Sequence, residues 1–136
     1  MRRAHAAVCL AFLATVLPLV GCYGPKTAEV SGMVNVDNQP LTKGSIGFVP
    51  ADGKGQTAGG EIIDGKYSAK VGLGVMKVEI RYPKVVDKKK DYDAPGGKYY
   101  DLYDESLPPK YNNETELSFE VKAGKNEKNW DVTKKP

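Results

Sequence analysis

Cysteine and histidine are scarce in this sequence, and the few present lie near its start. The 136 residues include two cysteines, Cys9 and Cys22, and one histidine, His5. The chain after Cys22 therefore cannot form a disulfide within itself. It also lacks the Ser-His and Cys-His pairs of nucleophilic hydrolases and any imidazole ligand for zinc. Apolar burial and strand pairing must therefore stabilise this chain.

Long hydrophobic runs are equally scarce, because the one extended apolar stretch is Ala6–Val20. Arg2 and Arg3 precede it and small residues follow it, which is the layout of a secretory signal over residues 1–21. A transmembrane helix is the first alternative, but the run is shorter than the ~20 residues that a span requires. An ordinary signal peptide, in which Cys22 has no special role, is the second.

The residues around the expected cleavage point carry a more specific pattern. Leu19, Val20, Gly21 and Cys22 follow one another at the end of the apolar run. This tetrapeptide resembles the lipobox of bacterial lipoproteins. The resemblance implies cleavage before Cys22, fatty acylation of its thiol (a palmitate-type modification) and attachment to a membrane facing the periplasm or the cell exterior. Tyr23 stands where an aspartate often signals inner-membrane retention in that family, which favours the outer membrane.

The charge of the sequence gives no reason to expect a nucleic-acid partner. Two of the 20 lysine and arginine residues, Arg2 and Arg3, lie in the signal, so the remainder nearly balances the 17 acidic residues. The expected strands also alternate positive and negative side chains instead of forming one basic face. The glycines fit neither a P-loop nor a dinucleotide-binding motif, and we expect no cofactor.

After a tether over residues 22–28, the domain expected over residues 29–136 alternates apolar and polar residues in short stretches, the pattern of half-buried strands. Asp64-Gly65 separates two such stretches and predicts a tight hairpin. We find no helical pattern after the signal. About seven strands separated by turn residues predict an all-β, seven-stranded Greek-key sandwich. The expected strands are 29–37, 45–49, 58–63, 66–71, 75–82, 116–122 and 127–132.

Five motifs in the first half of this domain resemble the carboxypeptidase regulatory-like domain, which has a prealbumin (transthyretin-like) fold. They are Val30-Ser-Gly-Met-Val-Asn-Val, Gln39-Pro40-Leu41, Gly44-Ser-Ile-Gly-Phe48, Asp64-Gly-Lys-Tyr67-Ser and Lys77-Val-Glu-Ile80. The pattern departs from the family at Gly72-Leu73-Gly74 and at the long insert that follows. The resemblance implies an accessory, adhesive or spacer domain without catalytic residues. We therefore expect a non-enzymatic envelope module whose partner is the membrane, an envelope polysaccharide or another protein.

The insert over residues 83–115 shows no clear periodicity, and we expect a long loop. Loops of this length in compact domains are functional or disordered. Because a long loop must bury some of its side chains to stay ordered, we expect its tyrosines to pack against the sandwich. The alternative is a carbohydrate-binding surface built by the same rings. These residues are Tyr92, Tyr99, Tyr100, Tyr103 and Tyr111.

The insert also contains the acidic residues nearest to a cation site. Asp91-Tyr92-Asp93 begins like a calcium loop, but Pro95 and Leu102 occupy the fifth and twelfth positions, where the loop needs oxygen ligands. We therefore expect no metal site, and we expect an acidic loop balanced by neighbouring lysines. A small enzyme with paired carboxylates is a further alternative, for which no acid and base pair is evident. The candidate ligands are Asp91, Asp93, Asp101 and Asp104, with Glu105 beside them.

Overall fold

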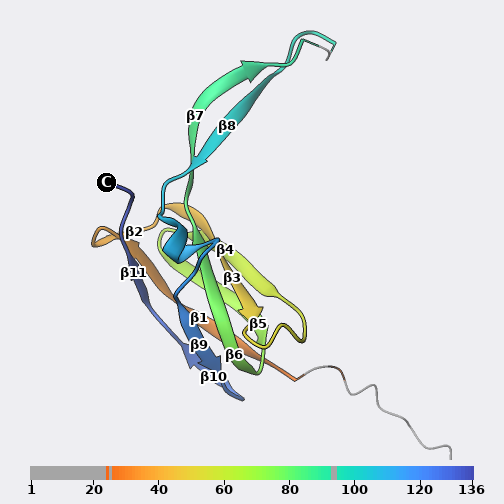
Figure 1. Cartoon of the computed structure of the whole chain (residues 1–136), viewed down its shortest axis with the longest axis vertical. Helices are drawn as coiled ribbons and strands as arrows, with labels where there is room; N and C mark the ends of the chain where they lie inside the picture. The colour runs from red at the N-terminus through yellow and green to blue at the C-terminus, as the bar shows by residue number, and fades with distance from the viewer. Residues whose placement is uncertain (1–23, 25, 93–94) are drawn as a thin grey trace, which may run out of the picture.

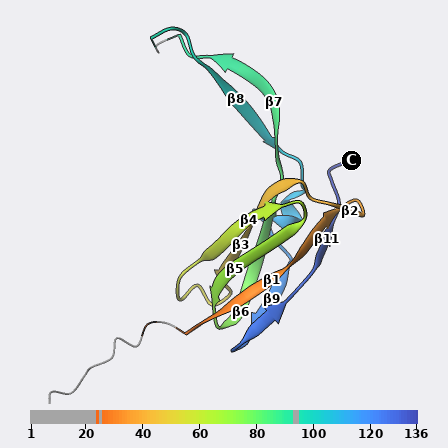
Figure 2. The ribbon, with the colours of Figure 1, turned by 180° about the vertical axis from the view of Figure 1, so that it is seen from behind.

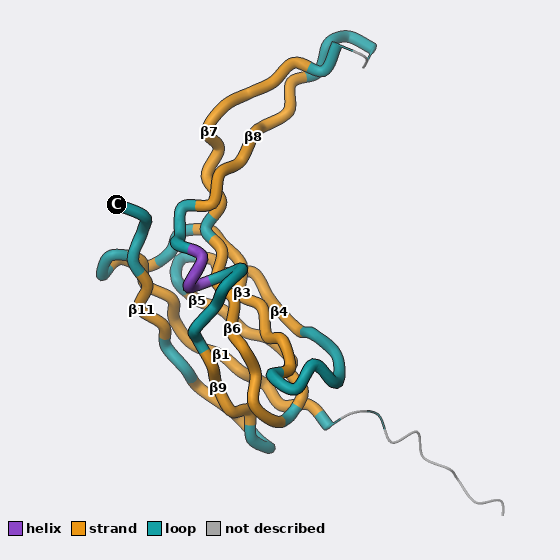
Figure 3. The backbone as a smooth tube through the Cα atoms, viewed as in Figure 1, coloured by secondary structure: helices purple, strands orange, loops and turns teal. Residues whose placement is uncertain are grey.

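A computed structural model of the chain describes residues 24, 26–92 and 95–136. The described chain is all-β, as expected, with one 3-10 turn, η1 (Pro109–Tyr111) (Figures 1 and 3). Among these residues no helix has the length and apolarity of a membrane span. The expected signal and lipobox lie outside the described residues. The strands are β1 (Thr27–Val36), β2 (Gln39–Pro40), β3 (Lys43–Pro50), β4 (Ala58–Ile63), β5 (Lys66–Gly72), β6 (Gly74–Arg81), β7 (Pro83–Lys90), β8 (Tyr99–Glu105), β9 (Ser118–Val121), β10 (Lys125–Glu127) and β11 (Trp130–Val132).

Nine of the strands form one curled sheet, which we call the body. Its order is β10-β1-β5-β4-β3-β6-β9, and β2 and β11 also pair with β1. The two end strands, β9 and β10, are joined by a short turn, so the sheet must curl until its ends lie side by side (Figures 1 and 2). The Asn126 side chain secures this turn, because it bonds both the N–H and the C=O of Lys122.

Strand β1 is paired along both edges, and one glycine permits this. Its first edge pairs with β5, while its second pairs in parallel with β10 and then with β11. Between β10 and β11 the chain crosses Gly32, where a Cβ would lie 1.9 Å from the Lys128 carbonyl oxygen. That carbonyl accepts a 2.7 Å hydrogen bond from the hydroxyl of Tyr67 on β5. Any larger side chain at position 32 would displace this crossing.

The Asp64-Gly65 hairpin connects β4 to β5, as the sequence predicts. Both turn residues have positive φ, +50° at Asp64 and +79° at Gly65, which matches the requirement of a type I′ turn. The Gly65 carbonyl accepts the N–H of Val34, so the turn is tied to β1. The turn therefore fixes the register that places the inward residues of β5 beside those of β1.

The interior of the body is filled by apolar residues at alternating positions of the strands. Six of the seven predicted strands correspond to β1, β3, β4, β5, β6 and β9, whereas the strand predicted over 127–132 is interrupted between β10 and β11. Leu41 is buried after the first turn. Phe48 and Tyr67 lie close together, with ring centroids 6.3 Å apart. The buried apolar residues of the strands are Ala28, Val30, Val34, Val36, Ile46, Phe48, Ile62, Tyr67, Ala69, Val71, Met76, Val78, Ile80, Val121, Trp130 and Val132.

The prediction of a long loop over 83–115 is wrong for two stretches of the chain. Residues 83–90 and 99–105 form an antiparallel ribbon, β7–β8, and residues 106–117 lie against the body. The ribbon was missed because β7 is exposed along its whole length, and a strand without a buried face has no reason to alternate. The tether is also shorter than expected, since β1 begins at Thr27 and Ala28 is buried.

We predict that Tyr67→Phe lowers the free energy of unfolding by about 1–3 kcal/mol at neutral pH. The substitution removes the bond to Lys128 and leaves the Trp130 indole N–H, 3.3 Å from the Tyr67 hydroxyl, without its acceptor. Urea unfolding monitored by Trp130 fluorescence measures the change. Tyr82→Phe is the control, because the Tyr82 hydroxyl makes one long contact, 3.4 Å to Thr42.

The same hydroxyl predicts a pH dependence. Burial raises the pKa of Tyr67 above its ordinary value of 10.0, and the hydrogen bond from Trp130 opposes this only in part. Because the pKa is raised in the folded state, the contribution of the neutral Tyr67 hydroxyl to the free energy of unfolding is complete below pH 10.0. It is lost as the pH rises through the pKa of the folded state. Tyr67→Phe should therefore lose less stability than wild type above pH 10.0. An equal alkaline loss in both proteins would contradict this assignment.

Candidate functional site: the projecting arm

Strands β7 and β8 form a two-stranded ribbon that leaves one end of the body (Figures 1 and 2). We call Pro83–Glu105 the arm. Within residues 26–92 and 95–136, neither strand pairs with any third strand, so both outer edges present unpaired backbone groups. Isolated two-stranded ribbons are only marginally stable in water. An arm of this kind is well suited to pairing with a partner.

The tyrosines of the arm do not pack against the body, contrary to expectation. The exposed fractions are 83% for Tyr92, 67% for Tyr99, 46% for Tyr100 and 63% for Tyr103. Alternation places Tyr99 and Tyr103 on one face of β8 and Tyr100 on the other. Val85 lies opposite Tyr103 and is also half exposed. Apolar surface is therefore available on both faces of the ribbon.

Tyr111, outside the arm, behaves as predicted. Its ring packs against the core and its hydroxyl lies 3.3 Å from Thr133 Oγ1. That hydrogen bond lowers the pKa of Tyr111 below its ordinary value, outweighing the opposite effect of burial. The five tyrosines therefore divide into four exposed rings and one that attaches the segment after the arm to the body.

Two acidic residues of the arm lie opposite lysines. Asp101 lies opposite Lys88, with 3.8 Å between Oδ1 and Nζ, and Asp104 lies opposite Lys84. Cross-strand pairs of opposite charge stabilise a ribbon modestly. The described residues contain no group of three acidic, histidine or cysteine side chains able to hold a metal ion, and candidate Asp93 lies outside them. Asp91 is partly exposed next to the end of β7.

Glu105 fixes the base of the arm. Its Oε1 accepts the backbone N–H groups of Tyr82 and Leu107, at 2.9 Å and 3.0 Å. The Glu105 carbonyl accepts a 2.7 Å bond from Lys135 Nζ, and the Ser106 N–H bonds the Tyr82 carbonyl. One carboxylate oxygen thus joins the residue before β7 to the residues after β8, which holds the two strands together where they leave the body.

The segment after the arm contributes two buried residues that were not predicted. Leu107 has no exposed surface, and Asn112 is the buried polar residue of the described chain. The Asn112 amide nitrogen lies 3.3 Å from the Pro108 carbonyl, and its oxygen accepts the N–H of Asn113. Single residues in a proline-rich segment produce no periodicity. A lone leucine beside two prolines was the available signal.

A groove of about 490 Å³ lies where the arm meets the body. Val85 and Tyr103 line it from the arm, while Lys43 and Glu61 line it from β3 and β4. One wall is therefore apolar, and the other carries both signs of charge. A ligand lying along the arm can contact this groove without any rearrangement of the body.

Comparisons with known proteins give little further information. No family model matches the sequence, and no curated protein matches it. Among solved structures, the chain is similar to a 9R-lipoxygenase from Cyanothece PCC8801, with 10% identity and a TM-score of 0.40. The match covers 79% of this chain but 16% of the lipoxygenase chain, so this chain spans a small part of that protein.

We predict that Glu105→Ala releases the base of the arm, while Glu105→Gln largely preserves it. Alanine removes the acceptor of two backbone N–H groups, whereas the glutamine carbonyl can accept both. Hydrogen exchange at Tyr82 and Leu107 should accelerate at least tenfold in the alanine variant, with a loss of about 1–3 kcal/mol in unfolding free energy. Unchanged exchange at both amides in Glu105→Ala would contradict the proposed role.

Proposed function

We propose that this chain is a lipid-anchored, non-enzymatic module of a bacterial cell envelope, and that its arm binds another envelope macromolecule. The observation that carries the proposal is the arm itself, whose tyrosines are exposed and whose outer edges pair with no third strand in the described chain. Exposed apolar side chains gathered on one element are characteristic of interaction sites. The lipid anchor is proposed at Cys22, on the lipobox resemblance of residues 19–22.

The arrangement of the two ends supports this proposal. Strand β1 begins at the end of the body opposite the arm (Figures 1 and 2). An anchor at Cys22 would therefore attach the body to the membrane by the end opposite the arm. The eight residues of β7 span roughly 26 Å at the usual rise of a strand, so the arm extends the reach of the module considerably.

We further propose that the body is a seven-stranded, Greek-key sandwich of the carboxypeptidase regulatory-like, prealbumin type. The strands on which the five family motifs lie, the buried Leu41 and the Asp64-Gly65 hairpin support this assignment. Domains of this type act through the surfaces that they present. The insert that departs from the family pattern is the part of this chain that forms the arm.

The geometry favours a protein partner that adds a strand to the arm. An edge strand offers a row of backbone donors and acceptors, and the junction groove offers a pocket for side chains beside it. An envelope polysaccharide is the second candidate, favoured by the exposure of four tyrosines. It ranks second because these rings are divided between both faces of the ribbon and do not form one flat platform.

We predict that Cys22 carries the lipid. Cells supplied with a labelled fatty acid should incorporate label into the wild-type chain but not into Cys22→Ala, because the thiol is the acylated atom. Cys9→Ala is the matched control and should be labelled normally. Equal labelling of the wild type and Cys22→Ala, or no labelling of either, would refute the anchor.

We predict that the arm contacts the partner directly. A photoreactive phenylalanine analogue in place of Tyr103 should form discrete crosslinked adducts in intact cells. The same analogue at Ser68, which is exposed on β5 of the body, should not. Adducts of equal yield from both positions, or none from the arm, would show that the arm is not the binding element.

The same arm distinguishes the two candidate partners. Tryptic digests of the Tyr103 adducts should contain peptides of a second protein if the partner is a protein, and glycosidase treatment should remove the adducts if the partner is a polysaccharide. A glycan array probed with the wild type and with Tyr99→Ala tests the second candidate independently. Glycan binding that is lost on this substitution would favour the polysaccharide and displace the protein partner.

A further inference from the structure

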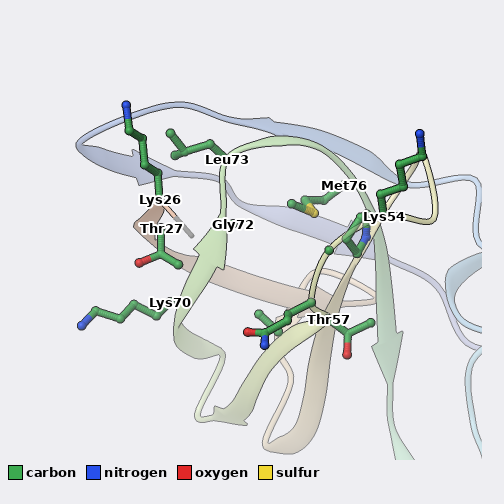
Figure 4. A pocket seen from close by; sticks show the side chains of 12 residues that line it. Lys26, Thr27, Lys54, Thr57, Lys70, Gly72, Leu73 and Met76 are labelled. Atoms are coloured by element: carbon green, nitrogen blue, oxygen red, sulfur yellow. The ribbon is translucent and has the colours of Figure 1, made fainter. Parts of the chain in front are cut away.

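A second groove, of about 400 Å³, lies at the end of the body opposite the arm (Figure 4). It is formed by the start of β1, the loop between β3 and β4, the end of β5 and the start of β6. Met76 and Pro50 provide apolar surface within it, and Leu73 lies at its rim in the β5–β6 turn. This groove takes no part in the arm or in its junction with the body.

The charged residues that line the groove are all positive. Its lining includes three lysines, Lys26, Lys54 and Lys70, and no aspartate or glutamate. The ammonium groups of Lys54 and Lys70 form no ion pair among the residues that the structure describes. A positive rim around apolar surface matches a negatively charged partner.

The nearest acidic residues have other contacts. The Asp52 carboxylate accepts the backbone N–H of Lys54 at 2.8 Å. Glu29 lies opposite Lys70 across the β1–β5 ladder, but its Oε1 accepts the Ser68 hydroxyl at 3.3 Å. These two carboxylates reduce the positive potential of the rim but form no ion pair with Lys54 or Lys70 among the described residues.

The lysines diverge instead of converging. In Figure 4, Lys26 and Lys70 extend outward on one side of the groove and Lys54 extends outward on the other. Ammonium groups arranged in this way cannot bind one phosphate together. They can contact several separate anions that lie in a plane, as phospholipid headgroups do in a bilayer. The divergence therefore favours a membrane surface over a single small anion.

The position of the groove fits the same partner. Four residue steps separate Cys22 from Lys26, and an extended chain of that length spans at most about 14 Å. If Cys22 carries the proposed lipid, the groove is held within that distance of the bilayer surface. This closeness to the bilayer depends on the proposed anchor.

We propose that this end of the body is a membrane-docking face. Lys26, Lys54 and Lys70 contact anionic phospholipid headgroups, and Leu73 inserts its side chain into the interfacial region. Docking would hold the body upright, with the arm directed away from the membrane, because attachment through one lipid-bearing residue does not by itself set the orientation of the body. Each lysine near an anionic surface strengthens binding roughly fivefold.

Cosedimentation with vesicles tests the proposal without the lipid anchor. The chain from Tyr23 to Pro136 contains every core residue, from Ala28 to Val132, and therefore retains the fold. It should bind vesicles of phosphatidylcholine with phosphatidylglycerol and not vesicles of phosphatidylcholine alone, and high salt should weaken the binding. Binding of equal strength to both vesicles would overturn the proposal.

Charge reversal locates the surface. Lys54→Glu with Lys70→Glu should weaken binding to the anionic vesicles at least twentyfold. The control, Lys43→Glu with Lys66→Glu, makes the same change in net charge at exposed positions near the arm and should lose less than fivefold. Equal losses in the two double variants would overturn the assignment of this face.

Two further measurements distinguish the source of the anion and the inserted residue. Inorganic phosphate at constant ionic strength should not displace the chain from the vesicles, and complete displacement would indicate a site for a single anion.

Since the chain after Cys22 lacks cysteine, Leu73→Cys accepts one environment-sensitive dye. Its emission should shift to the blue on anionic vesicles, whereas dye at Ile63→Cys, also exposed, should not shift.

The outcomes separate this proposal from that of the anchor. Uptake of fatty acid at Cys22 without binding to anionic vesicles would support the anchor and refute the docking face. Binding to anionic vesicles through Lys54 and Lys70 without uptake of fatty acid would support the docking face and refute the anchor.

Discussion

The crossing of the chain over Gly32 is the constraint on which the closed body depends. At this point the Lys128 carbonyl occupies the space of a missing Cβ and accepts the Tyr67 hydroxyl. The crossing lets one strand, β1, pair first with β10 and then with β11 along a single edge. Trp130 is thereby directed into the core, where its indole N–H meets the same hydroxyl. The pairing of β1 with both β10 and β11 and the burial of Trp130 on the last strand depend on this contact.

The strands of the body could be predicted from the sequence because burial of one face makes apolar and polar residues alternate along each strand. Val30, Val34 and Val36 lie inward on β1 at the positions that their spacing assigned. The crossing itself could not be predicted, because a glycine in a strand has several explanations and the contacting residue lies 96 positions away. Long-range approaches of this kind leave no local pattern.

The arm could not be predicted for the opposite reason. Lys88, Lys89 and Lys90 follow one another in β7 because neither face of the ribbon is buried, so no alternation was selected. Its tyrosines were recognised as a candidate site, but their exposure depends on where the ribbon leaves the body. That exit is set by Glu105 and by the buried Leu107, neither of which belongs to any periodic pattern. The residues of the site were therefore visible in the sequence, and its geometry was not.

The direct passage of β6 into β7 has a mechanical consequence. Tyr82 alone separates the two strands, so a force that pulls on the arm is transmitted along β6. Strand β6 is hydrogen-bonded to β3 on one side and to β9 on the other. A load along its axis would shear both ladders at once, instead of opening them one bond at a time. The body is in this respect built to withstand tension between its two ends.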